Sequence, residues 1–280
     1  MNRYPGIDLQ GASVAITGGA RGIGLATAEM FAERGARVAI GDLDGSGAEI
    51  AAKGFGGLGL PLDVTDADSF QEFIARAEAA HGPIDVLVNN AGVMPNGDFL
   101  ELGLASDRMT MEVNLFGVIH GMRAVLPGML ERGSGHVVNV ASLAGKFPVK
   151  GLATYNASKF AVVGLTAAAR LEYADKGVSL TAILPSAVDT ALASGLDMRP
   201  IPKVKPEAIA VAVVDSVSNR RAEVAVPGYV GFIADLAAVT PTPVLDRFRK
   251  LIRDDRALAA DSPERQAYRD GLHDQEGHRA

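Results

Sequence analysis

Short apolar runs alternate with longer helical patterns along most of this 280-residue chain. The runs are apolar at consecutive positions, as expected of strands covered on both faces, and the segments between them have helical spacing. Repeated strand–helix order predicts an α/β fold, in which a doubly wound parallel sheet is flanked by helices on both faces. The expected strands cover residues 12–17, 37–42, 58–63, 84–89, 136–142 and 178–184.

The chain is expected to form one domain over residues 1–230, because no linker or composition shift interrupts residues 8–228. Residues 187–204 interrupt the alternation and are expected to form a substrate loop or short helices. Residues 221–230 provide a last strand. A helical extension is predicted over residues 231–280. Its amphipathic segment 243–259 is expected to pack on its own domain or on a neighbouring subunit, and binding to a membrane surface is the less favoured alternative.

Residues 261–280 of this extension are charged and weakly apolar, so the last 15–20 residues are expected to fray.

Composition limits the function classes. The formal net charge of -6 disfavours nucleic acid as a partner, because phosphate binding needs a basic face. The absence of cysteine excludes disulfides and thiol catalysis and fits a cytoplasmic location. No apolar run indicates a signal peptide or a transmembrane segment, and the five histidines lack metal-ligand spacing, so no catalytic metal is expected.

A glycine-rich turn follows the first strand. Gly18, Gly22 and Gly24 would let main-chain N–H groups approach a pyrophosphate at a helix N-terminus, although an ordinary turn is the alternative. Asp42 ends the second strand. A carboxylate at this position of a dinucleotide fold accepts hydrogen bonds from the adenosine ribose and repels a 2′-phosphate. The alternative is that Asp42 is a solvated side chain or caps a helix. This pattern predicts a Rossmann-type NAD site. Arg21 favours NADP instead, and NADP is the less favoured cofactor.

Tyr155 and Lys159 lie four residues apart, on one face of a helix expected over residues 153–172. A fixed ammonium favours the phenolate and would lower the pKa of a nearby phenol, which suits the phenol to acid/base chemistry. Ser142 precedes them at a strand end, where it could also be a simple cap. The spacing alone is weak evidence, and the surrounding motifs strengthen it.

These motifs together resemble the short-chain dehydrogenase/reductase family, in its simple single-domain branch. The resemblance runs from about residue 9 to residue 227. It rests on TGGARGIG (17–24), Asp42, LDV (62–64), NNAG (89–92), Asn114, VNVAS (138–142), YNASK (155–159) and PSAVDT (185–190).

The resemblance implies four catalytic residues. Tyr155 would be the general acid/base, Lys159 would bind the nicotinamide ribose and lower the Tyr155 pKa, and Ser142 would bind the substrate oxygen. Asn114 would hold a water that links Lys159 to a proton relay.

The implied cofactor ligands are Gly18, Arg21, Gly22, Ile23, Gly24, Asp42, Asp63, Val64, Asn90, Ala91, Gly92, Tyr155, Lys159, Pro185, Val188 and Thr190, with Asn89 also lining the cofactor and stabilising the sheet. The expected substrate residues are Met94, Ser142, Leu143, Phe147, Leu152 and Tyr155.

Most of the expected substrate residues are apolar, so the expected reaction is hydride transfer between NAD(H) and a largely apolar secondary alcohol or ketone. An NADP-dependent carbonyl reductase is the alternative, and a non-catalytic dinucleotide sensor is disfavoured because the catalytic residues are all present. Ser186 replaces the family's usual glycine and could narrow the nicotinamide site. The family's usual C-terminal run is also replaced, so the expected homo-oligomer is either a dimer or a tetramer.

Overall fold

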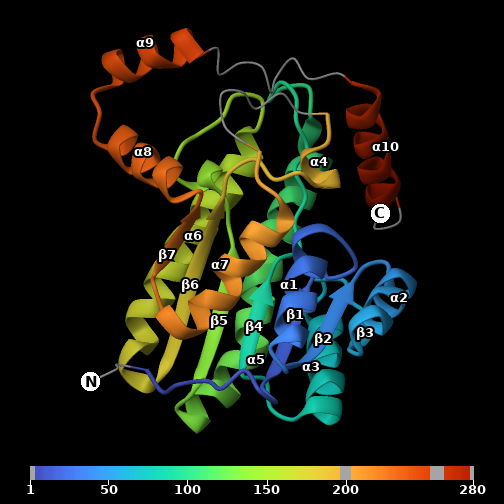
Figure 1. Cartoon of the computed structure of the whole chain (residues 1–280). Coiled ribbons are helices and arrows are strands. Elements are labelled where there is room, and N and C mark those ends of the chain that lie inside the picture. The colour runs from blue at the N-terminus through green and yellow to red at the C-terminus, as the bar shows by residue number, and fades with distance from the viewer. Residues whose placement is uncertain (1–3, 196–202, 253–261, 278–280) are drawn as a thin grey trace.

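The computed structural model describes residues 4–195, 203–252 and 262–277. Its seven strands form one parallel sheet in the order β3-β2-β1-β4-β5-β6-β7, which confirms the predicted doubly wound fold (Figure 1). The strands are β1 (Ser13–Thr17), β2 (Arg37–Asp42), β3 (Leu58–Pro61), β4 (Val86–Asn89), β5 (Gly135–Val140), β6 (Val178–Pro185) and β7 (Glu223–Val226).

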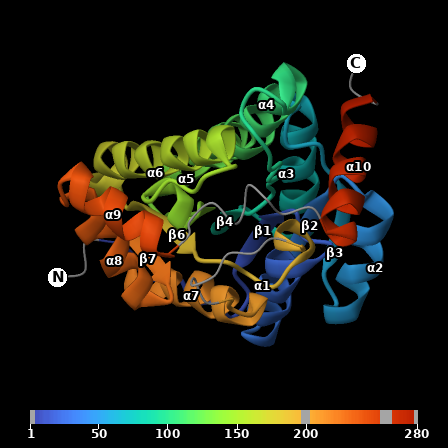
Figure 2. The same ribbon diagram turned by 90° about the horizontal axis from the view of Figure 1, so that it is seen from above.

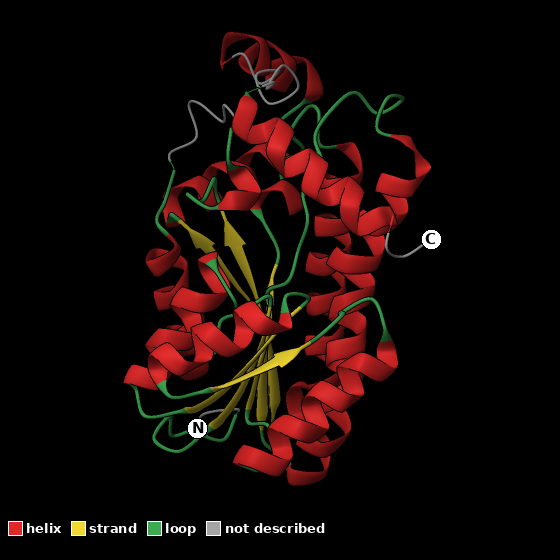
Figure 3. Ribbon diagram, turned by 90° about the vertical axis from the view of Figure 1, so that its right-hand side faces the viewer, coloured by secondary structure: helices red, strands yellow, loops and turns green. Residues whose placement is uncertain are grey.

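Helices cover both faces of the sheet (Figures 2 and 3). Helices α3 (Ala67–His81), α5 (Gly117–Arg132) and α6 (Ala153–Tyr173) pack on one face, and α1 (Gly22–Glu33), α2 (Gly45–Phe55) and α7 (Pro206–Asn219) pack on the other. Successive side chains of a strand point to opposite faces, so Ala15 of β1 joins one core while Val14 and Ile16 join the other. Consecutive apolar residues in one strand therefore supply two cores.

A continuous helical segment from Gly103 to Arg132 joins α4 (Gly103–Met111), a π-helical turn (Glu112–Phe116) and α5. By length and mean hydropathy it is apolar enough to cross a membrane, but half of the 18-residue window that is this apolar is buried inside the domain. Its buried residues include Val118, Met122 and Met129, which belong to the core beneath the sheet. The segment therefore serves as a core helix of this domain.

The chain after the sheet is helical, as α8 (Gly228–Ala238), α9 (Thr242–Ile252) and α10 (Pro263–Gly277). In both Figure 1 and Figure 2, α8 and α9 lie at one side of the molecule and α10 at the other. The last strand is shorter than expected, because Pro227 is the N-cap of α8 and residues 228–230 are helical. The predicted end of the amphipathic segment, and part of the 187–204 loop, lie outside the described residues.

Residues 263–277 differ from the expected frayed tail, because they form α10. The reason is tertiary packing: Arg265 and Leu272 are buried, and Tyr268 packs on the main core. Local composition could not reveal these contacts, because their partners lie far away in the sequence.

Candidate active site

A cavity of about 860 Å³ lies at the carboxyl edge of the sheet. Doubly wound folds bind ligands at this edge, where the loops after the strands converge. The cavity is lined by every predicted cofactor and substrate residue except Gly24 and Asn89, and by every predicted catalytic residue except Asn114. Two of the exceptions support residues that line it, because Gly24 lies against Gly18 and Asn90, and Asn114 hydrogen-bonds Val93. Asn89 is buried in β4, where its amide donates a hydrogen bond to Asn139 of β5.

Three glycines of the turn between β1 and α1 occupy positions that disfavour a side chain, for two different reasons. Gly18 and Gly22 have φ values of +64° and +58°, in the left-handed region that favours glycine. A Cβ on Gly24 would lie 2.1 Å from the carbonyl oxygen of Gly18. The Asn90 side chain holds the turn from the β4 side, because its Nδ2 donates to the Thr17 and Gly18 carbonyls at 3.0 Å each. This close approach fits the cradle that a pyrophosphate requires.

Asp42 ends β2 beside this turn. Its Oδ2 accepts a hydrogen bond from the N–H of Ala20 at 3.1 Å, and its Oδ1 accepts one from Asp44 at 3.2 Å. Both oxygens retain lone pairs for ribose hydroxyls. The Asp44 carboxylate follows, and hydrogen bonds from Gly47 and Ser46 lower its pKa. The charge of the exposed Arg21 side chain adds a smaller contribution in the same direction. Asp42, which lines the cavity, and the adjacent Asp44 thus place two carboxylates near the Arg21 guanidinium.

Asp63 and Val64 form the next part of the wall, after β3. The Oδ1 of Asp63 accepts hydrogen bonds from the main-chain N–H and the hydroxyl of Thr65, at 3.0 and 2.7 Å. Val64 is buried, and its carbonyl oxygen lies 3.0 Å from Nδ1 of His120. These contacts fix the loop where the resemblance places the adenine.

Asn114 positions the loop after β4. It lies in the π-helical turn, and π-turns inside helices often occur at functional sites. Its Oδ1 accepts from the Val93 N–H and its Nδ2 donates to the Val93 carbonyl, both at 2.9 Å. A second Nδ2 bond reaches Ser158 at 3.1 Å. Gly92 leaves room for this clamp, since a Cβ there would lie 3.2 Å from Asn114 Oδ1 and 3.7 Å from Lys159 Nζ.

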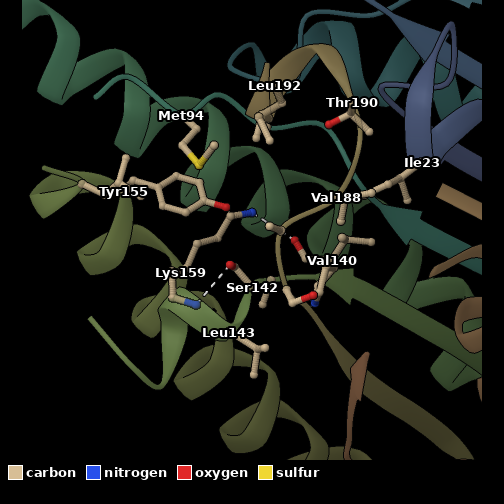
Figure 4. Close-up of a pocket in the computed structure, with 18 of the residues that line it drawn as sticks. Ile23, Met94, Val140, Ser142, Leu143, Tyr155, Lys159, Val188, Thr190 and Leu192 are labelled. Carbon is tan, nitrogen blue, oxygen red and sulfur yellow. Dashed lines mark hydrogen bonds between the residues drawn. The ribbon is translucent and has the colours of Figure 1, made fainter. Parts of the chain in front are cut away.

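Ser142, Tyr155 and Lys159 converge on the cavity. Ser142 follows β5, where its Oγ accepts from the Ala144 N–H at 3.1 Å, and its hydroxyl also hydrogen-bonds Tyr155. Tyr155 and Lys159 come from the first turns of α6 and are buried. Figure 4 shows the Tyr155 phenol and the Lys159 side chain reaching into the same part of the cavity.

The pKa values differ from the sequence-based expectation. Burial raises the pKa of Tyr155 to about 12, and the hydrogen bond from Ser142 opposes the rise. Burial also lowers the pKa of Lys159 to about 8. The expected depression of the Tyr155 pKa by Lys159 is therefore wrong for the protein alone. Desolvation dominates, and Lys159 Nζ donates to the Val140 carbonyl at 3.0 Å, with the Tyr155 ring centre 5.7 Å away.

Residues after β6 cover the cavity from the opposite side. Pro185 ends the strand beside Val226, and the N–H of Ser186 donates to the Val226 carbonyl at 2.9 Å. Val188 pairs with Val204 across the base of the loop. Thr190 reaches the glycine turn, where its Cγ2 would lie 3.4 Å from a Cβ on Gly22. The segment thus spans both halves of the predicted cofactor site.

The substrate half of the cavity is mainly apolar. Met94, Leu152 and Tyr155 pack in one buried cluster with Ala144 and Ala193. The cavity also has wall residues after β7 that were not predicted from the sequence, namely Tyr229, Val230, Ile233, Ala234, Leu236, Ala237, Thr240, Val244, Leu245, Tyr268 and Leu272. The spacing of Tyr268 and Leu272 could have indicated part of this wall. They lie four residues apart in an otherwise polar segment, as residues on one buried face of a helix do.

Groups of three or more histidine, aspartate or glutamate residues that could hold a metal do not occur among the described residues.

Comparison with known proteins identifies the family. Residues 12–199 match the family model for short chain dehydrogenases. A 2,5-dichloro-2,5-cyclohexadiene-1,4-diol dehydrogenase from Sphingobium indicum is 40% identical over 193 residues, covering 67% of this chain and 77% of that protein. A cis-4-hydroxycyclohexanecarboxylate dehydrogenase from Sinomonas cyclohexanicum is 39% identical over 214 residues, covering 71% and 86%.

Solved structures agree with these matches. A short chain dehydrogenase/reductase from Burkholderia phymatum in complex with NAD aligns with a TM-score of 0.76 and 25% identity, covering 82% of this chain and 94% of that one. A 3-ketoacyl-(acyl-carrier-protein) reductase from Brucella melitensis, complexed with NADH, aligns with a TM-score of 0.72 and 28% identity, covering 78% and 97%. The turn around Gly18 and Gly24 fits the same class of NAD(P) dinucleotide. The family model covers more than half of the chain, and the fold and the glycine turn agree with those of the family. This chain therefore belongs to the short-chain dehydrogenase/reductase family of oxidoreductases.

Proposed function

We propose that this protein is an NAD-dependent dehydrogenase that interconverts a largely apolar secondary alcohol and its ketone. The observation that carries the proposal is the convergence of Ser142, Tyr155 and Lys159 in an apolar cavity that also contains Asp42. Tyr155 is the acid/base, and Ser142 and Tyr155 together bind the reacting oxygen. A bound nicotinamide supplies or accepts the hydride.

Proton transfer explains the pair of hydroxyls. During alcohol oxidation the Tyr155 oxygen takes the proton of the substrate hydroxyl, and during ketone reduction it returns a proton to the developing oxyanion. Ser142 donates a hydrogen bond to the Tyr155 oxygen, which favours the phenolate. Lys159 holds its amine between the end of β5 and the Tyr155 ring, where it can also donate to a ribose hydroxyl.

The preference for NAD rests on charge at the adenosine end. Asp42 lies at the end of β2, where a 2′-phosphate would meet its carboxylate and that of the neighbouring Asp44. The position of Arg21 in the cavity wall favours the second candidate, an NADP-dependent carbonyl reductase, because a guanidinium there would pair with a 2′-phosphate. Two carboxylates against one exposed guanidinium favour NAD.

The substrate proposal rests on the wall of the cavity and on the relatives. Met94, Leu143, Phe147 and Leu152 offer apolar surface around the reacting hydroxyls. Two relatives bear names of dehydrogenases for six-membered ring alcohols. A ring alcohol or ring ketone is therefore the first class to test.

The test is a matrix of both cofactors against secondary alcohols of increasing size, from 2-propanol through cyclohexanol to a steroid alcohol, with the matching ketones in the reverse direction. The proposal predicts a kcat/KM at least about tenfold higher with NAD than with NADP, and higher with cyclohexanol than with 2-propanol because the walls are apolar. Preference for NADP would support the carbonyl reductase. Binding of either dinucleotide without turnover of any alcohol or ketone would contradict the enzyme proposal.

Self-association is a further part of the proposal. Phe232 and Leu236 of α8 and its C-cap residue Val239 are exposed by 70%, 56% and 78%. Large exposed apolar side chains of this kind favour burial against a second copy. Light scattering that gives the mass of a monomer at micromolar concentration would contradict it.

A further inference from the structure

Arg265 of α10 joins three segments that are distant in the sequence. Its side chain is 0% exposed. Nε donates to Asn96 Oδ1, one terminal nitrogen donates to the Met94 carbonyl, and the other donates to the Leu192 carbonyl at 2.9 Å. A guanidinium provides several donors in one plane, which suits it to hold separate acceptors at once. Arg265 therefore fixes α10 against the loops after β4 and β6.

The same helix brings Tyr268 to the cavity. The Arg265 guanidinium carbon lies 4.4 Å from the centre of the Tyr268 ring, and the two side chains are one turn apart. Tyr268 Oη accepts a hydrogen bond from the Met94 N–H at 3.0 Å. The phenol is thus held at its oxygen by the loop and along its ring by the guanidinium.

Tyr268 and Tyr155 face the same space. Both line the cavity, and Met94, which binds the Tyr268 oxygen through its main chain, packs in the cluster that contains Tyr155. Consistent with this proximity, the charge of Tyr268 contributes to raising the Tyr155 pKa, after the larger effect of burial.

The hydroxyl hydrogen of Tyr268 is available for a further bond. A phenol can accept and donate at the same time, and Met94 uses only an acceptor position. Among the residues that the structure describes, none accepts a hydrogen bond from the Tyr268 hydroxyl. Leu272, one turn further along α10, and the side chain of Met94 add apolar surface on the cavity side, while the Arg265 guanidinium lies along the ring. A hydroxyl donor beside apolar surface discriminates between ligands that have a matching oxygen and ligands that lack one.

We propose that Tyr268, held in place by Arg265, is a substrate-specificity residue that donates a hydrogen bond to a second oxygen of the substrate. This inference rests on the proposed function and narrows it. The substrate class becomes a compact apolar alcohol or ketone that bears a further hydroxyl or carbonyl group away from the reacting carbon.

The experiment compares two probes that differ by one oxygen, cyclohexanol and 1,4-cyclohexanediol, with saturating NAD. The parent is expected to prefer the diol. Tyr268→Phe keeps the ring and removes the donor, so its kcat/KM should fall about tenfold for the diol and less than about twofold for cyclohexanol. The loss should appear in KM, because binding of a remote group acts before chemistry.

Two further variants sharpen the result. Tyr173→Phe removes a tyrosine hydroxyl at the end of α6, away from the residues that line the cavity, and should leave the ratio of diol to cyclohexanol unchanged. Arg265→Lys keeps a positive charge but loses the planar set of donors, so it should raise the KM for the diol as Tyr268→Phe does. Equal losses for both probes in Tyr268→Phe, or an equal effect of Tyr173→Phe, would overturn the inference.

A binding measurement separates this inference from the proposed reaction. Saturation-transfer NMR with the NAD-bound protein gives the Kd of each probe without turnover. If no alcohol is oxidised but the diol binds about tenfold more weakly to Tyr268→Phe, the reaction proposal fails and the specificity role stands. If the diol binds the parent no better than cyclohexanol does, the specificity role fails, whatever the turnover.

Discussion

Lys159 Nζ lies 5.7 Å from the centre of the Tyr155 ring while it donates a hydrogen bond to the main-chain oxygen of Val140. The amine is therefore fixed by the end of β5, one helical turn from the phenol. Burial disfavours the charged form of both groups, so it raises the pKa of Tyr155 and lowers the pKa of Lys159. A bound dinucleotide would add charge and hydrogen bonds at this position, and the proton chemistry depends on that addition.

Ser142→Ala is expected to move the pH profile of alcohol oxidation to higher pH. The Ser142 hydrogen bond lowers the Tyr155 pKa, so its removal should raise the pH at which kcat/KM increases. The loss of one donor to the oxyanion should also lower kcat by roughly 10²-fold. Ser142→Thr, which keeps a hydroxyl, is the matched control. An Ala variant with slower turnover but an unshifted profile would contradict the link between Ser142 and the Tyr155 pKa.

Lys159→Met is expected to change how stability depends on pH. The Lys159 pKa is about 8 in the folded protein, against an ordinary value of 10.5. Between these values the unfolded chain binds more protons, so the stability of the parent rises with pH across this window. From about pH 7 to about pH 9.5, the parent should gain on the order of 2 kcal/mol in unfolding free energy relative to the variant.

Urea unfolding without cofactor at the two pH values measures this difference. The upper value stays below the ordinary pKa of tyrosine, 10.0, because titration of Tyr155 above it would lower the stability of the parent. Lys53→Met, on the exposed face of α2, retains Lys159 and should therefore keep the pH dependence of the parent. An equal pH dependence for the parent and for Lys159→Met would show that Lys159 is not held in a desolvated site.

Gly24→Ala is expected to weaken NAD binding and to destabilise the fold by about 1–3 kcal/mol, because the new Cβ would overlap the carbonyl oxygen of Gly18. Gly54→Ala is the matched control. It lies in α2 with nothing within 4 Å of its Cβ position, so it should stabilise the protein by about 0.5–1 kcal/mol. Calorimetric titration with NAD and thermal unfolding measure both effects. Unchanged NAD affinity in Gly24→Ala would place the pyrophosphate elsewhere.

Asp42→Asn is expected to narrow the preference for NAD over NADP by about tenfold, because it removes one negative charge facing a 2′-phosphate while keeping the shape of the side chain. The measurement is the ratio of kcat/KM values for the two cofactors. Arg21→Ala should shift this ratio in the opposite direction, since it removes a guanidinium at the glycine turn that would pair with a 2′-phosphate. An unchanged ratio of kcat/KM values in Asp42→Asn would show that Asp42 does not determine the preference for NAD over NADP.

The fold was predictable because its signals are local. Consecutive apolar residues such as Val14, Ala15 and Ile16 identify a strand that is covered on both faces. Gly18 and Gly24 mark the turn, because no side chain can replace them without a steric clash or an unfavourable backbone conformation. These constraints act over a few residues and can be identified along the chain.

The remainder depends on contacts that the sequence does not display. Arg265 looks like one more charge in a polar tail, and its acceptor Met94 lies 171 positions earlier. The pKa directions of Tyr155 and Lys159 follow from how deeply α6 is covered, which spacing alone does not reveal. Asn114 was expected to hold a water, a role that stays a prediction, whereas its side chain visibly clamps Val93.

The most direct test of the account is the turnover of Tyr155→Phe measured beside its affinity for NAD. The variant keeps the ring that packs with Met94 and removes only the acid/base oxygen. Turnover with the best alcohol of the panel should fall by on the order of 10²–10⁴-fold, while the Kd for NAD stays within about twofold of the parent value. Turnover within a few-fold of the parent, with NAD still bound, would show that Tyr155 does not transfer the proton.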